Sequence, residues 1–319
     1  MDEFELIRRF FLRDNNDKSV LIGIGDDGAV IKPSPEHDLV MSTDTLIEDI
    51  HFPNCLSAED IGYRCVAVNV SDIAAMGARA RWMTLALTLP NIDQEWLKKF
   101  SNGFYSAAQE YGVSLIGGDT TQGQKISLTV NITGEVKPKQ AITRSNASYD
   151  DLIFVTGNIG DAAAGLDLIV NSSDINDMKK SLIRRFSRPT ARHELGQALS
   201  GIASAAIDIS DGLYADTKKL LMASKLGGHL YIDRLPISKA LKETFGQERS
   251  IECSLGGGDD YELLFTAPAI KLNEIHEIVN KYNIPITEIG EVRKYSQLSC
   301  SLNDKLFNYD DSGYLHFNG

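Results

Sequence analysis

The stretch DDLIFVTGNIGDAAAGLDLIV, residues 150–170, decides the fold. Its apolar run LIFVT is followed by a turn that contains Gly157 and Gly160, and then by a segment rich in alanine and leucine. This order predicts a strand, a turn and a helix. We expect these three elements to begin a second domain. The polar stretch TRSNASYDD at 143–151 comes just before it and supplies the boundary. We therefore predict two mixed α/β domains, residues 1–145 and 146–319.

Length and charge limit the classes of protein to which the chain can belong. Its 319 residues, 43% of them hydrophobic, are enough for two domains with substantial cores. The formal net charge is −12 at pH 7, which argues against a nucleic-acid surface and against binding to anionic membranes by bulk charge. If the substrate is itself anionic, a cation has to lie between it and the protein.

The N-terminus and the cysteines predict a cytoplasmic protein. The opening residues, MDEFELIRRFFLRD, mix acidic, apolar and basic side chains, which is typical of an amphipathic helix and not of a signal peptide. No apolar run is long enough to span a membrane, and the best candidate, WMTLALTLP at 82–90, is typical of a buried strand. The four cysteines form no C-x-x-C pair, so they indicate neither a zinc site nor a disulfide framework.

Apolar periodicity and turn residues predict further strands and helices on both sides of the boundary. One helix begins near Ser57, where Asp60 completes a capping box, and ends at Gly77. The other elements expected in the first domain are strands over 20–25, 26–30, 38–45, 82–90, 113–118 and 126–136, and a helix over 94–111. Those expected in the second domain are a helix over 191–204, a helix that ends near 224, and a glycine-rich loop at 254–266 that runs into a strand.

Acidic residues gather at the predicted strand ends and turns. They are Asp26, Asp27, Asp44, Asp72, Asp119, Asp208, Asp211, Asp259, Asp260 and Glu262. Taken singly, an aspartate beside glycine is more often a turn or cap residue than a ligand. Asp72 differs, because on a helix its carboxylate lies on or beside the apolar face and has to be protonated, paired with an arginine or bound to a metal. Oxygen ligands without histidine or cysteine favour Mg²⁺, or else Mn²⁺ or Ca²⁺, over zinc.

A magnesium site suggests a nucleotide, because Mg²⁺ usually shares its coordination with substrate phosphates. The sequence has neither the G-x-x-x-x-G-K-[ST] loop nor the H-R-D and D-F-G motifs of protein kinases. The turn in TGNIGDAAAG at 156–165 is similar to a phosphate-binding strand–turn–helix, but it is also typical of a simple helix cap. Phosphoryl transfer by this chain therefore requires a different kind of site.

Several motifs, in order along nearly the whole chain, together resemble the thiamine-monophosphate kinase family. They include GIGDDGAV at 23–30, STDTLIEDIHF at 42–52, AVNVSDIAAMGA at 67–78, LIGGDTTQG at 115–123, VTGNIGDAAAGL at 155–166, IDISDGLYAD at 207–216 and GGGDDYELLFT at 256–266. That family is part of a superfamily with aminoimidazole ribonucleotide synthetase and selenophosphate synthetase. The resemblance implies the superfamily's two-domain α/β fold of the α+β type, in which the N-terminal domains of two subunits form a dimeric β-barrel. It also implies a homodimer that uses ATP and Mg²⁺ to convert thiamine monophosphate into thiamine diphosphate and ADP.

The same resemblance implies roles for individual residues. Ligands of several Mg²⁺ ions would be Asp27, Ser42, Thr43, Asp44, Asp72, Asp119, Asp208 and Asp211. Contacts with ATP would come from Tyr105, Gly118, Asp119, Arg144 and Ser210. Contacts with the thiamine moiety would come from His51, Asp259 and Tyr314. The residues expected to be catalytic are Asp44, Asp72, Asp119, Arg144 and Asp211.

Phosphoryl transfer gives such an acidic site a physical reason. Two polyanions have to meet, and two unit charges 4 Å apart repel by about 4 kcal/mol at an effective dielectric constant near 20. Metal ions and Arg144 would offset this repulsion, so that positioning and charge neutralisation supply most of the catalysis. The acceptor phosphate is already ionised at neutral pH, and we therefore expect no general base. For His51 a satisfied structural histidine is the alternative, and Tyr314 could instead pin the C-terminus to the core.

Three other interpretations of the chain are open. The nearest is an ATP-dependent member of the same superfamily with a different acceptor. Against it, the N-terminus lacks the reactive cysteine of selenophosphate synthetases. The chain also ends in HFNG, whereas the related hydrogenase-maturation protein ends in a cysteine. A noncatalytic nucleotide-binding module would be expected to have lost ligand carboxylates, yet each main position is filled. An acidic structural protein would show no Mg²⁺-dependent nucleotide binding.

Overall fold

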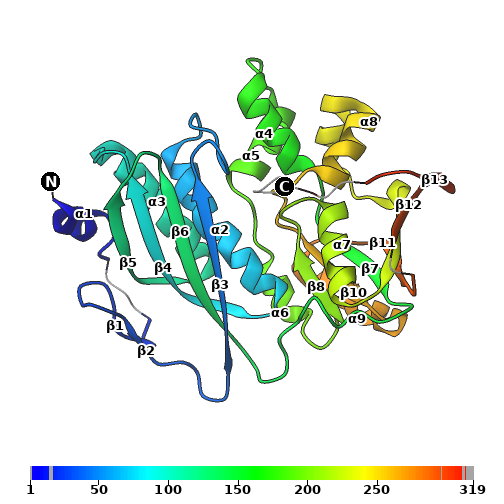
Figure 1. The fold of residues 1–319 in the computed structure, drawn as a ribbon, viewed down its shortest axis with the longest axis horizontal. Coiled ribbons are helices and arrows are strands. Elements are labelled where there is room, and N and C mark those ends of the chain that lie inside the picture. Colours follow the sequence, from blue (N-terminus) through cyan, green and yellow to red (C-terminus); the bar gives the residue numbers. More distant parts are fainter. Residues whose placement is uncertain (1, 14–16, 296, 311–312, 314–319) are drawn as a thin grey trace. The chain divides into compact units, whose positions relative to one another are not determined.

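The computed structural model of the chain describes residues 2–13, 17–295, 297–310 and 313. These residues form two compact units, which we describe separately (Figure 1). Unit 1 comprises Met1–Ile73 and Ala78–Lys139, and unit 2 comprises Ala74–Gly77 and Gln140–Gly319. Among the helices of the described residues, none combines the length and the apolar character needed to cross a membrane.

Unit 1 is built on a four-stranded sheet (Figure 1). Its strands, in spatial order, are β3 (Asp38–Ile47), β6 (Ser127–Val136), β4 (Arg79–Leu89) and β5 (Ser114–Gln122). Strand β6 pairs antiparallel with both β3 and β4, whereas β4 and β5 are parallel. Because a parallel pair needs a crossover connection, the chain passes from β4 to β5 through helix α3 (Gln94–Tyr111).

Helices α2 (Ala58–Ala75) and α3 cover one face of this sheet, as Figure 1 shows. Alternate residues of β6, such as Leu128 and Ile132, are fully buried on that face. The two helices touch backbone to backbone, because a Cβ atom at Gly62 or Gly103 would lie only 2.1 or 1.8 Å from a carbonyl oxygen of the other helix. These glycines therefore set how closely α2 and α3 pack.

The first residues of unit 1 form a smaller structure beside the sheet. Helix α1 (Glu3–Phe10) precedes strands β1 (Val20–Ile22) and β2 (Val30–Ile31), which pair antiparallel. We call residues 17–34 the arm, and residues 23–29 its tip. The strand expected over 26–30 is wrong, because the Asp-Asp-Gly sequence there forms a bend and the strand begins only at residue 30.

Unit 2 contains a seven-stranded sheet. Its strands, in spatial order, are β13 (Lys305–Phe307), β12 (Leu298–Leu302), β9 (Gly227–Tyr231), β11 (Ile286–Arg293), β7 (Leu152–Thr156), β10 (Leu263–Ala267) and β8 (Ala205–Asp208). Neighbours pair antiparallel, apart from the parallel pair β12 and β9. Its helices include α4 (Asp161–Asn171), α5 (Asp177–Ser187), α6 (His193–Ala198), α7 (Leu213–Ala223), α8 (Lys239–Gly256) and α9 (Leu272–Tyr282).

Both faces of strands β7 and β10 in the sheet of unit 2 are buried. Val155 of β7 and Leu264 of β10 belong to one apolar cluster, together with residues of α7 and α8. Phe154 and Phe265 stack with ring centroids 5.2 Å apart in a second cluster, to which α6 and α9 contribute. Successive side chains of a strand point to opposite faces, so the two clusters lie on opposite sides of the sheet.

The predicted helices of the first domain are confirmed. Helix α3 has the expected bounds, and α2 begins after Ser57, whose Oγ accepts the Asp60 N–H and donates to the Asp60 carboxylate. The helix expected over 191–204 is wrong beyond Ala198, because the chain turns there and Gly201 adopts a φ of 78°. Helices α5, α8 and α9 are additions that the sequence patterns did not predict.

Candidate functional site

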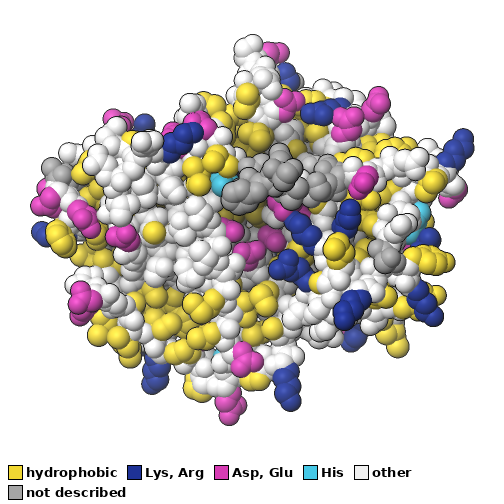
Figure 2. Space-filling view, in the orientation of Figure 1, with side chains coloured by type: hydrophobic (Ala, Val, Ile, Leu, Met, Phe, Trp, Pro, Cys, Tyr) yellow, Lys and Arg dark blue, Asp and Glu magenta, His cyan; other side chains and the backbone are white. Residues whose placement is uncertain are grey.

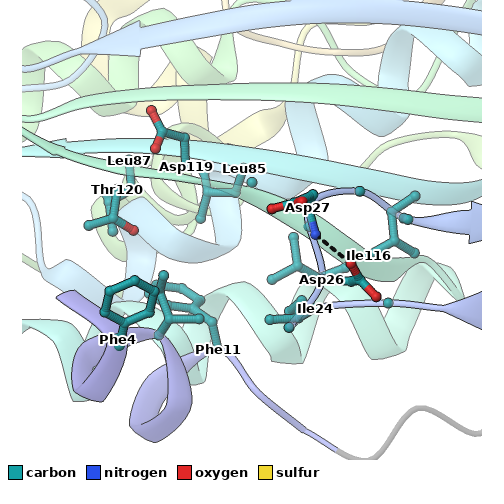
Figure 3. A pocket seen from close by; sticks show the side chains of 18 residues that line it. Phe4, Phe11, Ile24, Asp26, Asp27, Leu85, Leu87, Ile116, Asp119 and Thr120 are labelled. Atoms are coloured by element: carbon teal, nitrogen blue, oxygen red, sulfur yellow. Dashed lines mark hydrogen bonds between the residues drawn. The ribbon is translucent and has the colours of Figure 1, made fainter.

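Unit 1 contains a cavity of about 400 Å³ (Figure 3). Helix α1, the arm tip and strands β4 and β5 form its walls. Three predicted site residues line it: Asp27 from the arm tip, and Gly118 and Asp119 from β5. Phe4 and Phe11 add apolar surface on the side of α1 (Figure 3). A concave space with apolar walls and a few polar groups is typical of a small-molecule site.

Gly118 lies where strands β4 and β5 approach too closely for a side chain. It is paired with Leu85 in the sheet register, and a Cβ atom at Gly118 would lie 1.9 Å from the Leu85 carbonyl oxygen. Its φ of 156° is also rarely adopted by other residues. The approach of the strands is therefore enough to require this glycine, and the exposed Asp119 follows it directly.

A second polar group in unit 1 lies between β3 and α2. The Ser42 Oγ donates a 2.5 Å hydrogen bond to the Asp72 carboxylate, and the Asp44 N–H donates one of 3.2 Å to Asn69 Oδ1. Thr43 comes between them on β3, so its side chain points to the opposite face, where its Oγ1 accepts a 2.7 Å hydrogen bond from β6. The structure thus brings Ser42, Asp44 and Asp72 together at α2 and turns the Thr43 side chain away.

His51 and Tyr105 are both held by the backbone. The His51 Nδ1 accepts a 2.9 Å hydrogen bond from the Ile47 N–H, as in the structural alternative for this histidine. The Tyr105 hydroxyl donates to the Phe11 carbonyl oxygen at 2.5 Å, and the Arg13 guanidinium lies 3.8 Å from the centre of its ring. Burial raises the pKa of Tyr105 to about 12, although Arg13 lowers it. The protonated phenol therefore braces Phe11, which lines the cavity.

In unit 2, the segments IDISDG and GGGDDYE lie side by side at one end of the sheet. Strands β8 and β10 pair with Asp208 opposite Leu263. Beyond this ladder, the Asp259 N–H donates a 2.9 Å hydrogen bond to the Ser210 carbonyl oxygen. The pairing places three predicted site residues, Asp208, Ser210 and Asp259, at the same strand ends.

Asp211 faces a cation of its own chain. The Lys219 Nζ forms ion pairs with Asp211 and, at 2.7 Å, with the buried Asp216. Asp216 also accepts the N–H groups of Ser210 and Asp211 at 3.0 and 2.9 Å, so it orients the turn that carries Asp211. Burial would lower the pKa of Lys219, but its hydrogen bonds with Asp211 and Asp216 raise it, and the lysine stays charged. Asp216 and Lys219 were not predicted as site residues, although their i, i+3 spacing on a helix was a signal for them.

Two buried carboxylates anchor the glycine-rich loop. Asp260 accepts two backbone N–H groups at the start of α4, at 2.6 and 3.1 Å, and burial raises its pKa to about 8. Glu262 pairs with Arg185 at 2.8 Å and with Arg192 at 2.5 Å. Neither carboxylate is exposed, so Asp260 and Glu262 have a structural role among the acidic residues at strand ends and turns. They hold the loop in which Asp259 adopts a φ of 71°.

Two predicted site residues remain, Arg144 and Tyr314. Arg144 is exposed, and its carbonyl oxygen accepts a 2.8 Å hydrogen bond from the Ser224 Oγ. Tyr314 lies outside the described residues. Its neighbour Gly313 packs closely on α7, because a Cβ atom at Gly313 would lie 2.6 Å from the Ala215 Cβ.

The donor set of unit 1 fits Mg²⁺ that arrives with a phosphorylated ligand. Within the described residues, no three His, Cys, Asp or Glu side chains form a group that could hold a metal ion by themselves. Mg²⁺ seldom needs such a group, since one or two carboxylates, water and substrate phosphates usually complete its coordination. The structure offers such oxygen donors: Ser42 beside Asp72, and Asp27 and Asp119 at one cavity.

Comparison with known protein families finds a matching family model for each half of the chain. Residues 25–136 match the family model described as AIR synthase related protein, N-terminal domain, and residues 149–302 match the corresponding C-terminal domain. The fold described above is therefore the two-domain AIR synthase-like α/β fold.

Individual relatives narrow the assignment. Thiamine-monophosphate kinase from Escherichia coli (strain K12) is 40% identical over 319 residues, which cover 99% of this chain and 98% of the relative. The crystal structure of thiamine-monophosphate kinase from Stenotrophomonas maltophilia K279a is 40% identical, has a TM-score of 0.88 and covers 95% of this chain and 97% of its own. The chain belongs to the thiamine-monophosphate kinase family. Another similar structure is described as AaThiL complexed with AMPPCP and TMP, with a TM-score of 0.80, 32% identity and 92% coverage of both chains.

Proposed function

We propose that this chain transfers the γ-phosphate of ATP to thiamine monophosphate, which gives thiamine diphosphate and ADP. The observation that carries the proposal is the similarity, over nearly the full length, to kinases with this activity in their name, one of them solved with AMPPCP and TMP. The cavity of unit 1 supports it, because apolar walls suit a nucleotide base and exposed carboxylates suit phosphate-bound Mg²⁺.

We infer that oxygen donors of both units bind several Mg²⁺ ions. The ligands proposed are Asp27, Ser42, Thr43, Asp44, Asp72, Asp119, Asp208 and Asp211. When bound, Mg²⁺ would neutralise the phosphate oxygens that have to approach one another. Lys219 already balances the charge of Asp211, so an ion at Asp211 has to share this carboxylate with Lys219 or displace it.

Further residues orient the two substrates in this proposal. Those for ATP are Tyr105, Gly118, Asp119, Arg144 and Ser210, and those for the thiamine moiety are His51, Asp259 and Tyr314. The negative charge of Asp259 complements the thiazolium cation, and the 2.9 Å hydrogen bond from the Asp259 N–H to Ser210 fixes its position. Arg144 is permanently charged and stabilises the charge on the transferred phosphate.

The proposed mechanism depends on charge and position and not on proton transfer. The catalytic residues are Asp44, Asp72, Asp119, Arg144 and Asp211. The phosphate of the acceptor is ionised at neutral pH and attacks the γ-phosphate directly, so that no residue acts as a general base.

We also propose that the chain acts as a homodimer in the cytoplasm. Hydrophobic side chains gather over β1, β2 and β3 of unit 1 (Figure 2), where Leu21, Leu39 and Met41 are 60%, 45% and 63% exposed. A second copy of unit 1 would cover this surface and complete a β-barrel. The four cysteines are free thiols, which suits a reducing compartment.

The decisive experiment is to incubate the purified protein with ATP, Mg²⁺ and thiamine monophosphate, with free thiamine as a parallel acceptor, and to quantify thiamine diphosphate by chromatography. We expect Mg²⁺-dependent product from the monophosphate alone. Mg²⁺-dependent ATP binding without product would point to another acceptor within the superfamily or to a noncatalytic nucleotide-binding module. If ATP does not bind, the proposed function is wrong.

A further inference from the structure

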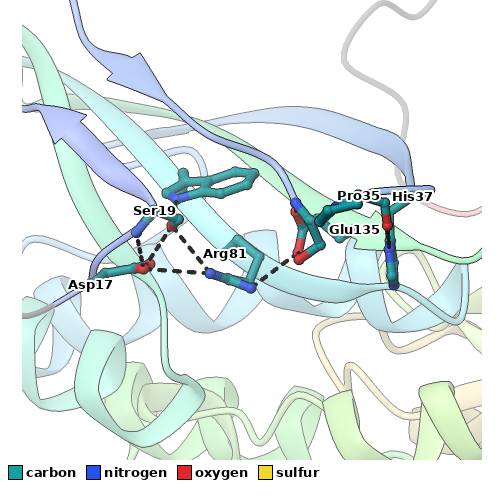
Figure 4. A network of polar contacts seen from close by, with 8 residues as sticks. Asp17, Ser19, Pro35, His37, Arg81 and Glu135 are labelled. Atoms are coloured by element: carbon teal, nitrogen blue, oxygen red, sulfur yellow. Dashed lines mark hydrogen bonds and ion pairs between the residues drawn. The ribbon is translucent and has the colours of Figure 1, made fainter.

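The two ends of the arm meet at one ion pair of the sheet, between Arg81 of β4 and Glu135 of β6 (Figure 4). The Arg81 Nη2 donates to Ser19 Oγ at 3.1 Å and lies 3.4 Å from the Asp17 carboxylate, while its Nη1 lies 3.0 Å from Glu135 on β6. At the other end of the arm, Ser34 donates from its N–H and its Oγ to Glu135, at 2.5 and 2.9 Å. The Arg81–Glu135 ion pair therefore ties residues 17–19 and residue 34 to the same point of the sheet.

A β-bulge directs Arg81 toward the arm. In the pairing of β4 with β6, Ala80 is opposite Gly134 and Trp82 is opposite Thr133, which leaves Arg81 as the extra residue. A bulge of this kind re-aims a side chain, and here both Arg81 and its neighbour Trp82 reach the arm. The Trp82 Nε1 donates to the same Ser19 Oγ at 2.9 Å.

The ion pair is largely shielded from water. The side chains of Arg81 and Glu135 are 15% and 4% exposed, so solvent screens their attraction little. Burial would raise the pKa of Asp17, but hydrogen bonds from Ser19 and the Arg81 guanidinium hold it below its ordinary value. The base of the arm is thus a defined electrostatic contact and not a loose surface association.

The tip of the arm contrasts with its base. Residues 25–29 are exposed, and the Asp27 N–H donates to the neighbouring Asp26 carboxylate. The same tip lines the cavity of unit 1, so the place of Asp27 depends on how the arm is held. We propose that Arg81 and Glu135 are positioning residues that fix both ends of the arm and thereby keep Asp27 at the cavity lined by Asp119. The proposal rests on the proposed function, because it takes Asp27 as a ligand of nucleotide-bound Mg²⁺.

The test compares Arg81→Met, which keeps the bulk of the side chain but removes its charge and donors, with the matched control Arg79→Met on the same strand. Ser19→Ala is the milder second variant, since it removes only the hydroxyl that Arg81 and Trp82 share. Asp27→Asn serves as the reference for loss of the ligand itself. Amide hydrogen exchange of residues 17–34 reports the arm. Calorimetric titration of the protein and ATP with Mn²⁺, corrected by the same titration of ATP alone, reports the metal affinity of the complex without turnover.

We expect Arg81→Met to speed exchange in the arm about tenfold, and Ser19→Ala to speed it less, while exchange in the rest of unit 1 is unchanged in both. Mn²⁺ affinity should fall about tenfold in Arg81→Met, and the Mg²⁺ concentration for half-maximal activity should rise to match, with kcat restored at high Mg²⁺. Asp27→Asn should weaken Mn²⁺ binding without faster exchange, and Arg79→Met should behave as the wild type.

Unchanged arm exchange, or unchanged Mn²⁺ affinity, in Arg81→Met would overturn the proposal. Faster exchange throughout unit 1 in both Arg81→Met and Ser19→Ala would also overturn it, since it would assign the contact to general stability. If the wild type forms no thiamine diphosphate, the proposed function fails, but exchange and Mn²⁺ affinity still decide the role of Arg81.

Discussion

A substitution at Asp72 tests whether this residue is a metal ligand or a structural carboxylate. Asp72→Asn keeps the size of the side chain and an acceptor for the Ser42 hydroxyl, but it removes the negative charge. We expect kcat to fall at least about 100-fold, the order found when one group that stabilises transition-state charge is lost. The unfolding free energy without metal should change by less than about 1 kcal/mol, because losing one carboxylate from an acidic region relieves repulsion.

Steady-state kinetics with Mg²⁺ and thermal unfolding in chelator measure these two effects. Asp38→Asn, at the exposed start of β3, is the control for the change of net charge and should leave kcat unaltered. A large loss of stability in metal-free Asp72→Asn would instead indicate that Asp72 belongs to a structural ion pair.

The raised pKa of Asp260 should make the stability of the fold depend on pH. Burial raises its pKa to about 8 in the folded chain, above the ordinary value of 3.8. Between these values the folded state holds a proton that the unfolded state has lost, so the contribution of Asp260 is complete below pH 3.8 and is lost as the pH rises toward 8. From pH 5 to pH 8, the unfolding free energy of the wild type should fall by about 3.5 kcal/mol more than that of Asp260→Asn.

Urea denaturation of both proteins at a series of pH values checks this prediction. Parallel pH profiles would show that Asp260 is ionised in the folded chain and is stabilised by the two N–H groups at the start of α4.

The acidic set shows what could be predicted for single residues. From sequence, Asp260 and Asp119 look alike, since each follows a glycine-rich segment and precedes a strand or lies in one. In the structure Asp119 is exposed at a cavity, whereas Asp260 is fully buried and caps a helix. The sequence patterns alone therefore could not tell the exposed Asp119 from the buried Asp260, because burial depends on contacts far along the chain.

Strand β5 offers a matched pair of glycines. A Cβ atom at Gly118 would lie 1.9 Å from the Leu85 carbonyl oxygen, whereas one at Gly117 would meet only the Thr84 Cγ2, at 3.9 Å. We expect Gly118→Ala to lower the unfolding free energy by at least about 2 kcal/mol, since the backbone of β4 has to move. Gly117→Ala should change it by less than about 0.5 kcal/mol. Urea denaturation of the two variants measures both changes in unfolding free energy. Equal losses of stability would contradict the close approach of β4 and β5.

The helices show which elements the sequence defines locally. Helix α3 was predicted correctly because both of its ends are encoded nearby: Asp93 accepts the N–H groups of the first turn, and Gly112 takes the left-handed conformation that ends it. Helix α6 is shorter than predicted, because the chain turns after Ala198 and Gly201 takes a positive φ, so the glycine at 201 was a local signal for an earlier end of this helix. The strand order of unit 2 was beyond local patterns, since β9 lies between β12 and β11, far from its neighbours in sequence.

For the chain as a whole, the ordered motifs predicted the two-domain fold and the family, and both are confirmed. No single motif could have done this, because each, taken alone, is also compatible with an ordinary turn, cap or helix. The dimeric barrel stays a prediction, and it depends on one surface: the exposed residues Leu21, Leu39 and Met41 on β1 and β3 of unit 1.

Met41→Glu tests whether a second copy covers this surface. Met41 is 63% exposed, and its neighbour Val40 points into the core, so a carboxylate at position 41 leaves the fold of unit 1 undisturbed. If the surface is the dimer interface, a buried charge at position 41 should weaken dimerisation at least about 100-fold, since an unpaired charge is costly to desolvate.

Sedimentation velocity at micromolar concentration measures the effect. The wild type and the control Ile270→Glu, which changes an 86% exposed residue of unit 2 in the same way, should sediment as dimers, while Met41→Glu should sediment as a monomer. A monomeric wild type would rule out the barrel. A Met41→Glu protein that remains dimeric would place the interface on another surface of the chain, because no barrel closed over β3 could bury two unpaired carboxylates at its centre without loss of affinity.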